Sequence, residues 1–204
     1  MVYNFKVVFL SFAKGTALNT HNFMLPLRRE QTEIIRAGDA VLLSGELYTA
    51  RDAAHKRFIE MLDAGLPLPF PVENSVIYYT GPSPAPPGEL CGSIGPTTSG
   101  RMDVYTPRLL SLGLRAMIGK GNRSPAVIEA IKSTGAVYLG AIGGAGALLA
   151  ACVKKIEVAA FDDLGAEAVF KLKVEKFPTT ALIDSLGNNL YVLGPKNYFL
   201  SRFG

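Results

Sequence analysis

Cysteine is scarce in this sequence, and its scarcity limits the metal chemistry that the chain can support. Only Cys91 and Cys152 occur among the 204 residues, without CxxC spacing and without a histidine nearby. The donors of a zinc site are therefore missing, and we expect no metal site built from this chain alone. The two thiols could form one disulfide, but nothing indicates an oxidising compartment, so free thiols are expected.

Long apolar runs and clustered charges are also absent. The apolar run Val7–Phe12 is too short to span a bilayer and is followed by a poor cleavage site, so we interpret it as an added strand and expect a soluble, cytoplasmic chain without membrane contact. The 21 basic and 17 acidic residues give a net charge of +4 and are scattered along the sequence. This distribution does not indicate nucleic-acid binding and is better suited to small anions.

The composition, 49% hydrophobic and 19% charged, is that of a folded globular chain. We expect one domain over residues 24–204, preceded by an extension over residues 1–23. The extension would consist of the strand just described and a polar link through Asn19, His21 and Asn22.

Strands and helices alternate through residues 114–153, which predicts an α/β fold with parallel strands and right-handed crossovers. Ligands of such sheets bind at the carboxyl ends of the strands. Later strands would complete a mixed sheet. The predicted strands cover residues 40–45, 75–80, 114–118, 136–142, 156–161, 168–176, 179–183 and 189–192.

The loop Cys91–Asp103 has the chemistry of an anion site. Its glycines let backbone N–H groups approach a ligand closely, the Thr97 and Thr98 hydroxyls can donate or accept, and Arg101 offers a planar fork to a carboxylate or phosphate. The same composition also suits an ordinary surface turn.

Two further cations stand where strands meet helices. Arg51 is predicted at a helix N-terminus, where the helix dipole disfavours a cation, so either it shares a bound anion with the helix or its side chain turns away into solvent. Lys120 lies in Gly119–Asn122, directly after a strand. This segment lacks the spacing of a phosphate-binding P-loop, and the glycines near residue 144 lack that of a dinucleotide site.

Taken together, several motifs resemble one family. The chain is similar to the β subunit of iron–sulfur hydro-lyases, the class I fumarases and the related tartrate dehydratases. The similarity runs from about Met24 to about Tyr198. It is carried by Leu43-Ser44-Gly45, Thr49-Ala50-Arg51-Asp52-Ala53-Ala54-His55-Lys56-Arg57, Tyr79-Thr80-Gly81-Pro82, Gly95-Pro96-Thr97-Thr98-Ser99-Gly100-Arg101-Met102-Asp103 and Gly119-Lys120-Gly121-Asn122.

The resemblance implies a swivelling β/β/α domain that docks on a separate α subunit, in an α2β2 assembly. Three cysteines of the α subunit would hold a [4Fe–4S] cluster. Arg51, Arg101 and Lys120 would bind the carboxylates of a small dicarboxylate substrate, and Thr97 would lie beside the carbon that gains or loses a proton. His55, Thr98 and Asn122 are further candidates near the substrate; for His55, a lone helix histidine, we favour a structural role.

Three interpretations remain open. The chain could belong to a fumarate hydratase, to a tartrate dehydratase, or to a complex in which it only binds anions or assists assembly. Residues 1–23 depart from the family pattern, in which the chain usually starts close to Leu25. Threonine is a poor base, so Thr97 would need an activating group, and a carboxylate of the α subunit is the natural candidate.

Overall fold

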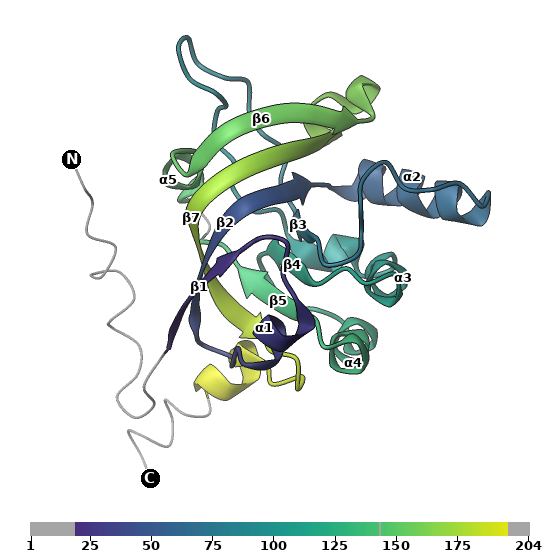
Figure 1. The fold of residues 1–204 in the computed structure, drawn as a ribbon, viewed down its shortest axis with the longest axis vertical. Coiled ribbons are helices and arrows are strands. Elements are labelled where there is room, and N and C mark those ends of the chain that lie inside the picture. The colour runs from purple at the N-terminus through teal and green to yellow at the C-terminus, as the bar shows by residue number, and fades with distance from the viewer. Residues whose placement is uncertain (1–18, 143, 196–204) are drawn as a thin grey trace.

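The computed structural model describes residues 19–142 and 144–195. A seven-stranded sheet forms its centre (Figure 1). The strands are β1 (Thr20–Met24), β2 (Ala40–Thr49), β3 (Val76–Tyr78), β4 (Ala116–Gly119), β5 (Val137–Gly140), β6 (Val153–Ala160) and β7 (Val169–Ile183). The α-helices are α1 (Arg29–Glu33), α2 (Asp52–Asp63), α3 (Thr106–Ser111), α4 (Pro125–Thr134) and α5 (Gly146–Ala150), and two 3₁₀ turns are η2 (Ser99–Met102) and η3 (Asp162–Glu167).

The sheet is mixed and closes on itself. β1 to β5 pair in chain order and in parallel, whereas β7 runs antiparallel to β2, β5 and β6. Because β7 pairs with both β5 and β2, the strands β2, β3, β4, β5 and β7 form a closed ring, with β1 and β6 attached outside it. The predicted α/β class with a mixed sheet is confirmed, and so is strand–helix alternation through residues 114–153.

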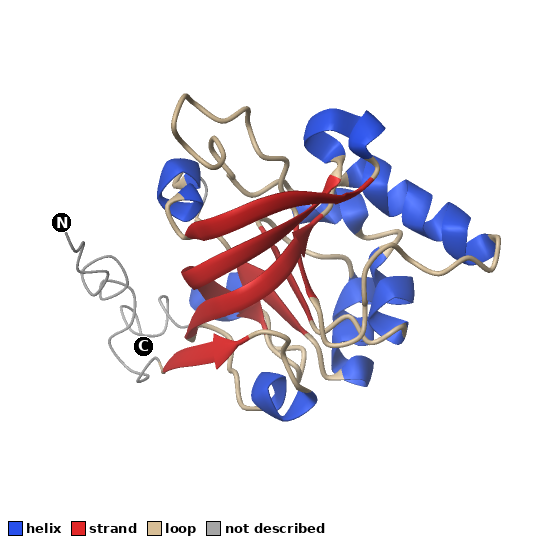
Figure 2. Cartoon of the chain, turned by 45° about the horizontal axis from the view of Figure 1, so that its top comes forward, coloured by secondary structure: helices blue, strands red, loops and turns tan. Residues whose placement is uncertain are grey.

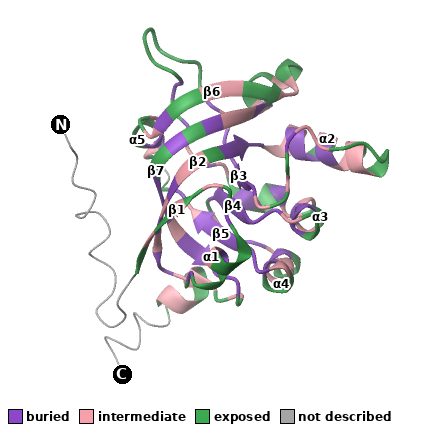
Figure 3. Cartoon of the chain, in the orientation of Figure 1, coloured by how far each residue is buried: buried purple, intermediate pink, exposed green. Residues whose placement is uncertain are grey.

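Successive side chains of the short parallel strands point to opposite faces of the sheet, so a buried cluster forms on each face. Val76 and Tyr78 of β3 join one buried cluster, and Ile77 and Tyr79 join the other. The second cluster includes the apolar residues of α2, α3 and α4, which lie on one side of the sheet, whereas α5 lies on the other (Figures 1 and 2). Buried positions concentrate on these strands and on the inner sides of the helices (Figure 3).

A local signal accounts for the start of α4. Ser124 caps α4, because its Oγ accepts the Val127 N–H at 3.4 Å, and Pro125 follows in the first turn, as predicted. The helix predicted near Arg51 is also present: Arg51 is the N-cap residue of α2. Its own side chain makes no capping hydrogen bond, so the free N–H groups of this helix need another partner.

Three predictions about the first and the last segments of the described chain are wrong. Residues 19–22 are not a polar link, because Thr20–Met24 form β1, whose His21 side chain is held 2.9 Å from the buried Asp39 carboxylate. The strands predicted at 168–176 and 179–183 are one strand, since β7 continues through Pro178, next to an irregularity at Lys176. Residues 190–195 are helical instead of forming a strand with 189.

Two further expectations concern the N-terminal region. The strand predicted at Val7–Phe12 lies outside the described residues. β1 crosses the boundary that we placed between residues 23 and 24, so the sheet already includes part of the expected extension.

No helix within residues 19–142 and 144–195 is both long enough and apolar enough to cross a membrane.

Candidate active site

The segments with the candidate residues meet at one edge of the sheet. Arg51 follows the carboxyl end of β2, Gly81 follows that of β3, and Lys120 follows that of β4. Because these strands are parallel, their carboxyl ends lie side by side. The loop Cys91–Asp103 joins this edge, since the Thr97 N–H donates to the Tyr79 carbonyl at 2.7 Å.

Arg51 lies against the turn after β3 and against η3. A methyl group at Gly81 would lie 3.2 Å from Cδ and Nη1 of Arg51 and 2.5 Å from the Ala166 carbonyl oxygen, so the close approach requires glycine. Nη2 of Arg51 lies 3.3 Å from the Glu167 carboxylate, and its side chain is 25% exposed. The guanidinium therefore stays at the site instead of turning away into solvent.

The two arginines of the site each face an acidic side chain of the same chain. Arg101, in η2, forms an ion pair with Asp52, the first residue of α2, with Nη2 and Oδ2 2.8 Å apart. This pair ties the Cys91–Asp103 loop to the α2 N-terminus. The Arg101 side chain remains 50% exposed, so its guanidinium is accessible to a ligand.

Thr97 and Thr98 lie at this edge, beside the ends of β3 and β4. Thr97 is half-buried and Thr98 exposed. Within the described part of the chain, the Thr97 hydroxyl has no hydrogen-bond partner, whereas its backbone is fixed to Tyr79. Thr98 pairs with Lys120 in an isolated parallel bridge. A hydroxyl on a fixed backbone, without a partner in residues 19–142 and 144–195, suits contact with a ligand.

Ser99 locks the Lys120 loop in place. The Ser99 N–H donates to the Lys120 carbonyl at 2.9 Å, and the Lys120 N–H donates to Ser99 Oγ at 3.1 Å. The buried Tyr138 hydroxyl lies 2.8 Å from the same Oγ and 3.0 Å from the Gly121 carbonyl. Burial raises the pKa of Tyr138, so this hydroxyl stays protonated and can donate. Lys120 and Asn122 themselves are exposed.

A buried ion pair supports the Cys91–Asp103 loop and the Gly119–Asn122 loop from the core side. Arg123 Nε donates to the Asp103 carboxylate at 2.6 Å, and Nη2 donates to the Thr106 hydroxyl at 2.8 Å. The guanidinium stacks over the rings of Tyr79 and Tyr138, 5.4 and 4.9 Å from their centroids. Burial acts to lower the pKa of Arg123, but its neighbours outweigh burial and the pKa is raised. The Arg123 guanidinium therefore stays charged.

His55 lies behind Arg51, fully buried among aromatic rings. Its Nδ1 lies 2.8 Å from the Arg51 carbonyl, which can only accept, so Nδ1 carries the proton and Nε2 does not. Burial lowers the pKa of His55 to about 4. A neutral, inaccessible imidazole supports the structural role over direct contact with a substrate.

The thiols do not suit an iron–sulfur cluster. Such clusters are held by several cysteine thiolates, and this chain has two cysteines, of which Cys91 is buried in the core with its pKa raised by burial. Among the described residues, no group of three or more histidine, cysteine, aspartate or glutamate side chains could hold a metal ion. The donor set of this chain does not fit the cluster.

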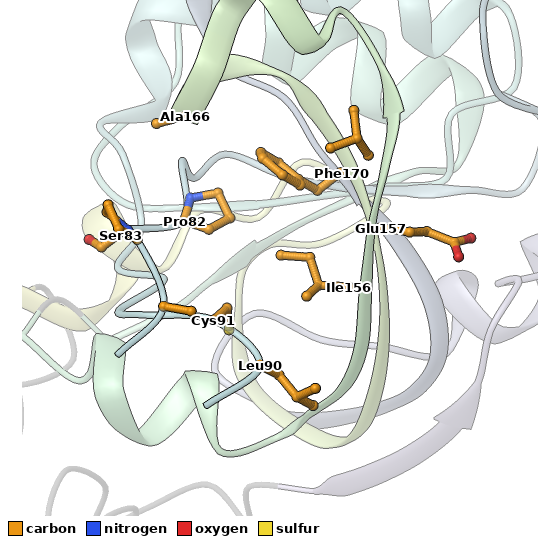
Figure 4. Close-up of a pocket in the computed structure, with 11 residues that line it drawn as sticks. Pro82, Ser83, Leu90, Cys91, Ile156, Glu157, Ala166 and Phe170 are labelled. Carbon is orange, nitrogen blue, oxygen red and sulfur yellow. The ribbon is translucent and has the colours of Figure 1, made fainter. Parts of the chain in front are cut away.

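A separate cavity of about 390 Å³ lies between the proline-rich loop after β3 and the strands β6 and β7 (Figure 4). Its lining is mostly apolar, with Pro82, Leu90, Ile156 and Phe170, and the carboxylate of Glu157 points away from these residues. None of the candidate site residues lines it. A dicarboxylate would find no cation there, so the open edge with the three cations is the better candidate.

Sequence reasoning named the exposed candidates but missed their supports. Asp52 could have been found, because it adjoins Arg51 in the sequence. Glu167 could not, because it caps α2 from 114 residues away, where its Oε2 accepts the Ala53 N–H at 3.1 Å. The roles of Tyr138 and Arg123 likewise depend on contacts that only the fold creates.

Comparison with known proteins shows the family of this chain. Residues 12–194 match the family described as Fumarase C-terminus. Fumarate hydratase 2 of Leishmania major is 46% identical over 165 residues, which cover 80% of this chain and 29% of that protein. The anaerobic class I fumarate hydratase of Escherichia coli is 44% identical over 151 residues, 73% of this chain and 28% of that protein.

A third relative has nearly the length of this chain. The putative L(+)-tartrate dehydratase subunit beta of Methanocaldococcus jannaschii is 40% identical over 171 residues, 81% of this chain and 88% of that protein. By contrast, the chain spans only about a third of the length of the first fumarate hydratases that it matches. It belongs to the Fumarase C-terminus family, the region that class I fumarate hydratases share with a tartrate dehydratase beta subunit.

Proposed function

We propose that this chain is the β subunit of a two-subunit hydro-lyase that reversibly hydrates fumarate to malate. The observation that carries the proposal is that the segments bearing Arg51, Thr97, Arg101 and Lys120 meet at the carboxyl edge of the sheet. Cations placed on separate loops suit a substrate with two carboxylates, because each carboxylate can receive its own charge-assisted hydrogen bonds.

Hydration adds a proton to one carbon of the double bond and a hydroxyl to the other. In our proposal Thr97 lies beside the carbon that exchanges the proton. The hydroxyl of threonine is a weak base, and no carboxylate among the described residues bonds it. The activating group would come from the partner subunit.

The partner would also hold the [4Fe–4S] cluster, because the donors of this chain do not fit one. The relative from Methanocaldococcus jannaschii supports a separate subunit, since it is named a subunit and has nearly the length of this chain. An α2β2 assembly is the stoichiometry that we propose. The compartment that we propose is the cytoplasm, which is compatible with free thiols at Cys91 and Cys152.

Anaerobic co-expression with a candidate α subunit tests the proposal. The purified complex should interconvert fumarate and malate, and the chain alone should be inactive. Assays with both tartrates belong to the same experiment, since a tartrate dehydratase would use the same cations and would turn over tartrate in preference to fumarate. A complex without activity on any of these acids would contradict the catalytic proposal and favour a role in anion binding or assembly.

A further inference from the structure

We propose that Glu167 is a positioning residue that holds the Arg51 guanidinium in the orientation that receives a substrate carboxylate. This inference rests on the proposed function of the site. Glu167 ends η3, in the connection between β6 and β7, a part of the chain to which the sequence assigned no role.

The Glu167 carboxylate makes two contacts with the start of α2. Its Oε2 accepts the Ala53 N–H at 3.1 Å, and its Oε1 lies 3.3 Å from Nη2 of Arg51. Arg51 is the N-cap residue of that helix and does not cap it with its own side chain. A carboxylate brought from a distant turn therefore satisfies a free N–H group and orients the cation beside it.

The other contacts of Arg51 leave its orientation to Glu167. Its Cδ and Nη1 lie along Gly81, and Nε is buried without a hydrogen-bond partner in the described part of the chain. Glu167 is thus the only acidic partner of Arg51 among the described residues. Because the Glu167 carboxylate holds one end of the planar guanidinium, the remaining N–H donors of Arg51 point in a single direction.

The negative charge of Glu167 could instead compete with the substrate for Arg51. The expected changes in substrate affinity differ between competition and positioning. Both side chains of the pair are a quarter or more exposed, so solvent screens their attraction, and removing the charge alone would tighten binding only slightly. Loss of a charge-assisted contact with a carboxylate ligand weakens binding by about tenfold or more. We therefore expect weaker binding when Glu167 is replaced.

A second acidic residue of η3 provides a matched control. Asp163 forms an ion pair with Arg57, farther along α2, with Nη1 and Oδ1 2.7 Å apart. Asp163 also fastens η3 to α2, but Arg57 is not part of the candidate site. A residue that only docks the two segments should behave like Asp163.

The test compares Glu167→Gln and Asp163→Asn in the reconstituted complex. Glutamine can still accept the Ala53 N–H, but then it turns an amide donor toward Arg51. We expect Glu167→Gln to raise KM for fumarate and the inhibition constant of succinate, a dicarboxylate that cannot be hydrated, by about tenfold, with kcat changed less than about threefold. Asp163→Asn should leave both constants within about twofold.

Two further variants complete the design. In an Arg51→Lys background, Glu167→Gln should produce no further rise, because Glu167 acts through Arg51. Glu167→Asp, whose carboxylate is too short to keep both contacts, should produce a smaller rise, and it serves if the glutamine variant does not assemble.

Each outcome decides one question. Lower constants for Glu167→Gln would show competition with the substrate and overturn the inference. Unchanged constants, or equal changes for Glu167→Gln and Asp163→Asn, would reduce Glu167 to a docking contact and overturn it too. If Arg51→Lys itself leaves the succinate constant unchanged, the proposed function of the site is wrong, which is distinct from a failure of Glu167 alone.

Discussion

Replacement of Arg123 by methionine should destabilise the fold strongly, because the guanidinium is buried and is paired with the Asp103 carboxylate. Its side chain is 0% exposed and donates to Asp103 at 2.6 Å and to Thr106 at 2.8 Å. Methionine keeps much of the volume but leaves the Asp103 carboxylate, which is only 12% exposed, without its countercharge. Breaking a buried pair in this way costs about 3 to 5 kcal/mol.

The individual contacts give a similar magnitude. A hydrogen bond to a charged group contributes about 1.5 to 3 kcal/mol. The cation–π contacts with Tyr79 and Tyr138 add to this loss, because such contacts are stronger at a desolvated site than the roughly 0.5 to 1 kcal/mol of exposed pairs. Asp103 retains its hydrogen bond from the Ser124 N–H, which limits the loss.

Urea denaturation of the full chain measures this loss. Arg108→Met is the matched control, since Arg108 pairs with Asp63 at the surface, where both side chains are largely exposed. We expect the control to lose less than about 1 kcal/mol. An unfolding free energy for Arg123→Met within about 1 kcal/mol of the wild type would refute the argument that this pair supports both site loops.

Two further predictions concern His55 and Gly119. Because burial lowers the pKa of His55 to about 4, its neutral form stabilises the fold above the ordinary histidine value of 6.5, and up to about 3 kcal/mol should be lost as pH falls from 6.5 toward 4. Urea unfolding should therefore show a flatter pH dependence in His55→Gln than in the wild type, and equal slopes would contradict the assignment. Gly119→Ala should cost about 1 to 3 kcal/mol in thermal unfolding, because the new methyl would lie 1.9 Å from Ser99 Oγ, and Ser99→Gly in the same chain should restore part of the loss.

The sequence predicted the parallel part of the fold well because its signals are local. Ser124 followed by Pro125 marks the start of α4, and short apolar runs mark β4 and β5. The failures occur where a partner distant in sequence decides the structure. β1 is polar and half-exposed, and it becomes a strand because β2 pairs with it and Asp39 receives His21.

The candidate site follows the same division. Thr97, Arg101 and Lys120 lie in loops whose glycines and hydroxyls were visible in the sequence. Which residues hold the site depended on the fold, since Tyr138 holds Ser99 and Gly121, and Glu167 holds the start of α2, from positions much later in the sequence. A carboxylate that caps a helix from 114 residues away has no local signature.

The most direct measurement of the central proposal is the rate of fumarate hydration by the anaerobic complex with Thr97→Ala, compared with Thr97→Ser. Serine keeps the hydroxyl on a backbone fixed by Tyr79, so it should retain much of the activity. Alanine should lower kcat by orders of magnitude while the subunits still assemble. Near-normal turnover by Thr97→Ala in an intact complex would contradict the placement of the reacting carbon at this threonine.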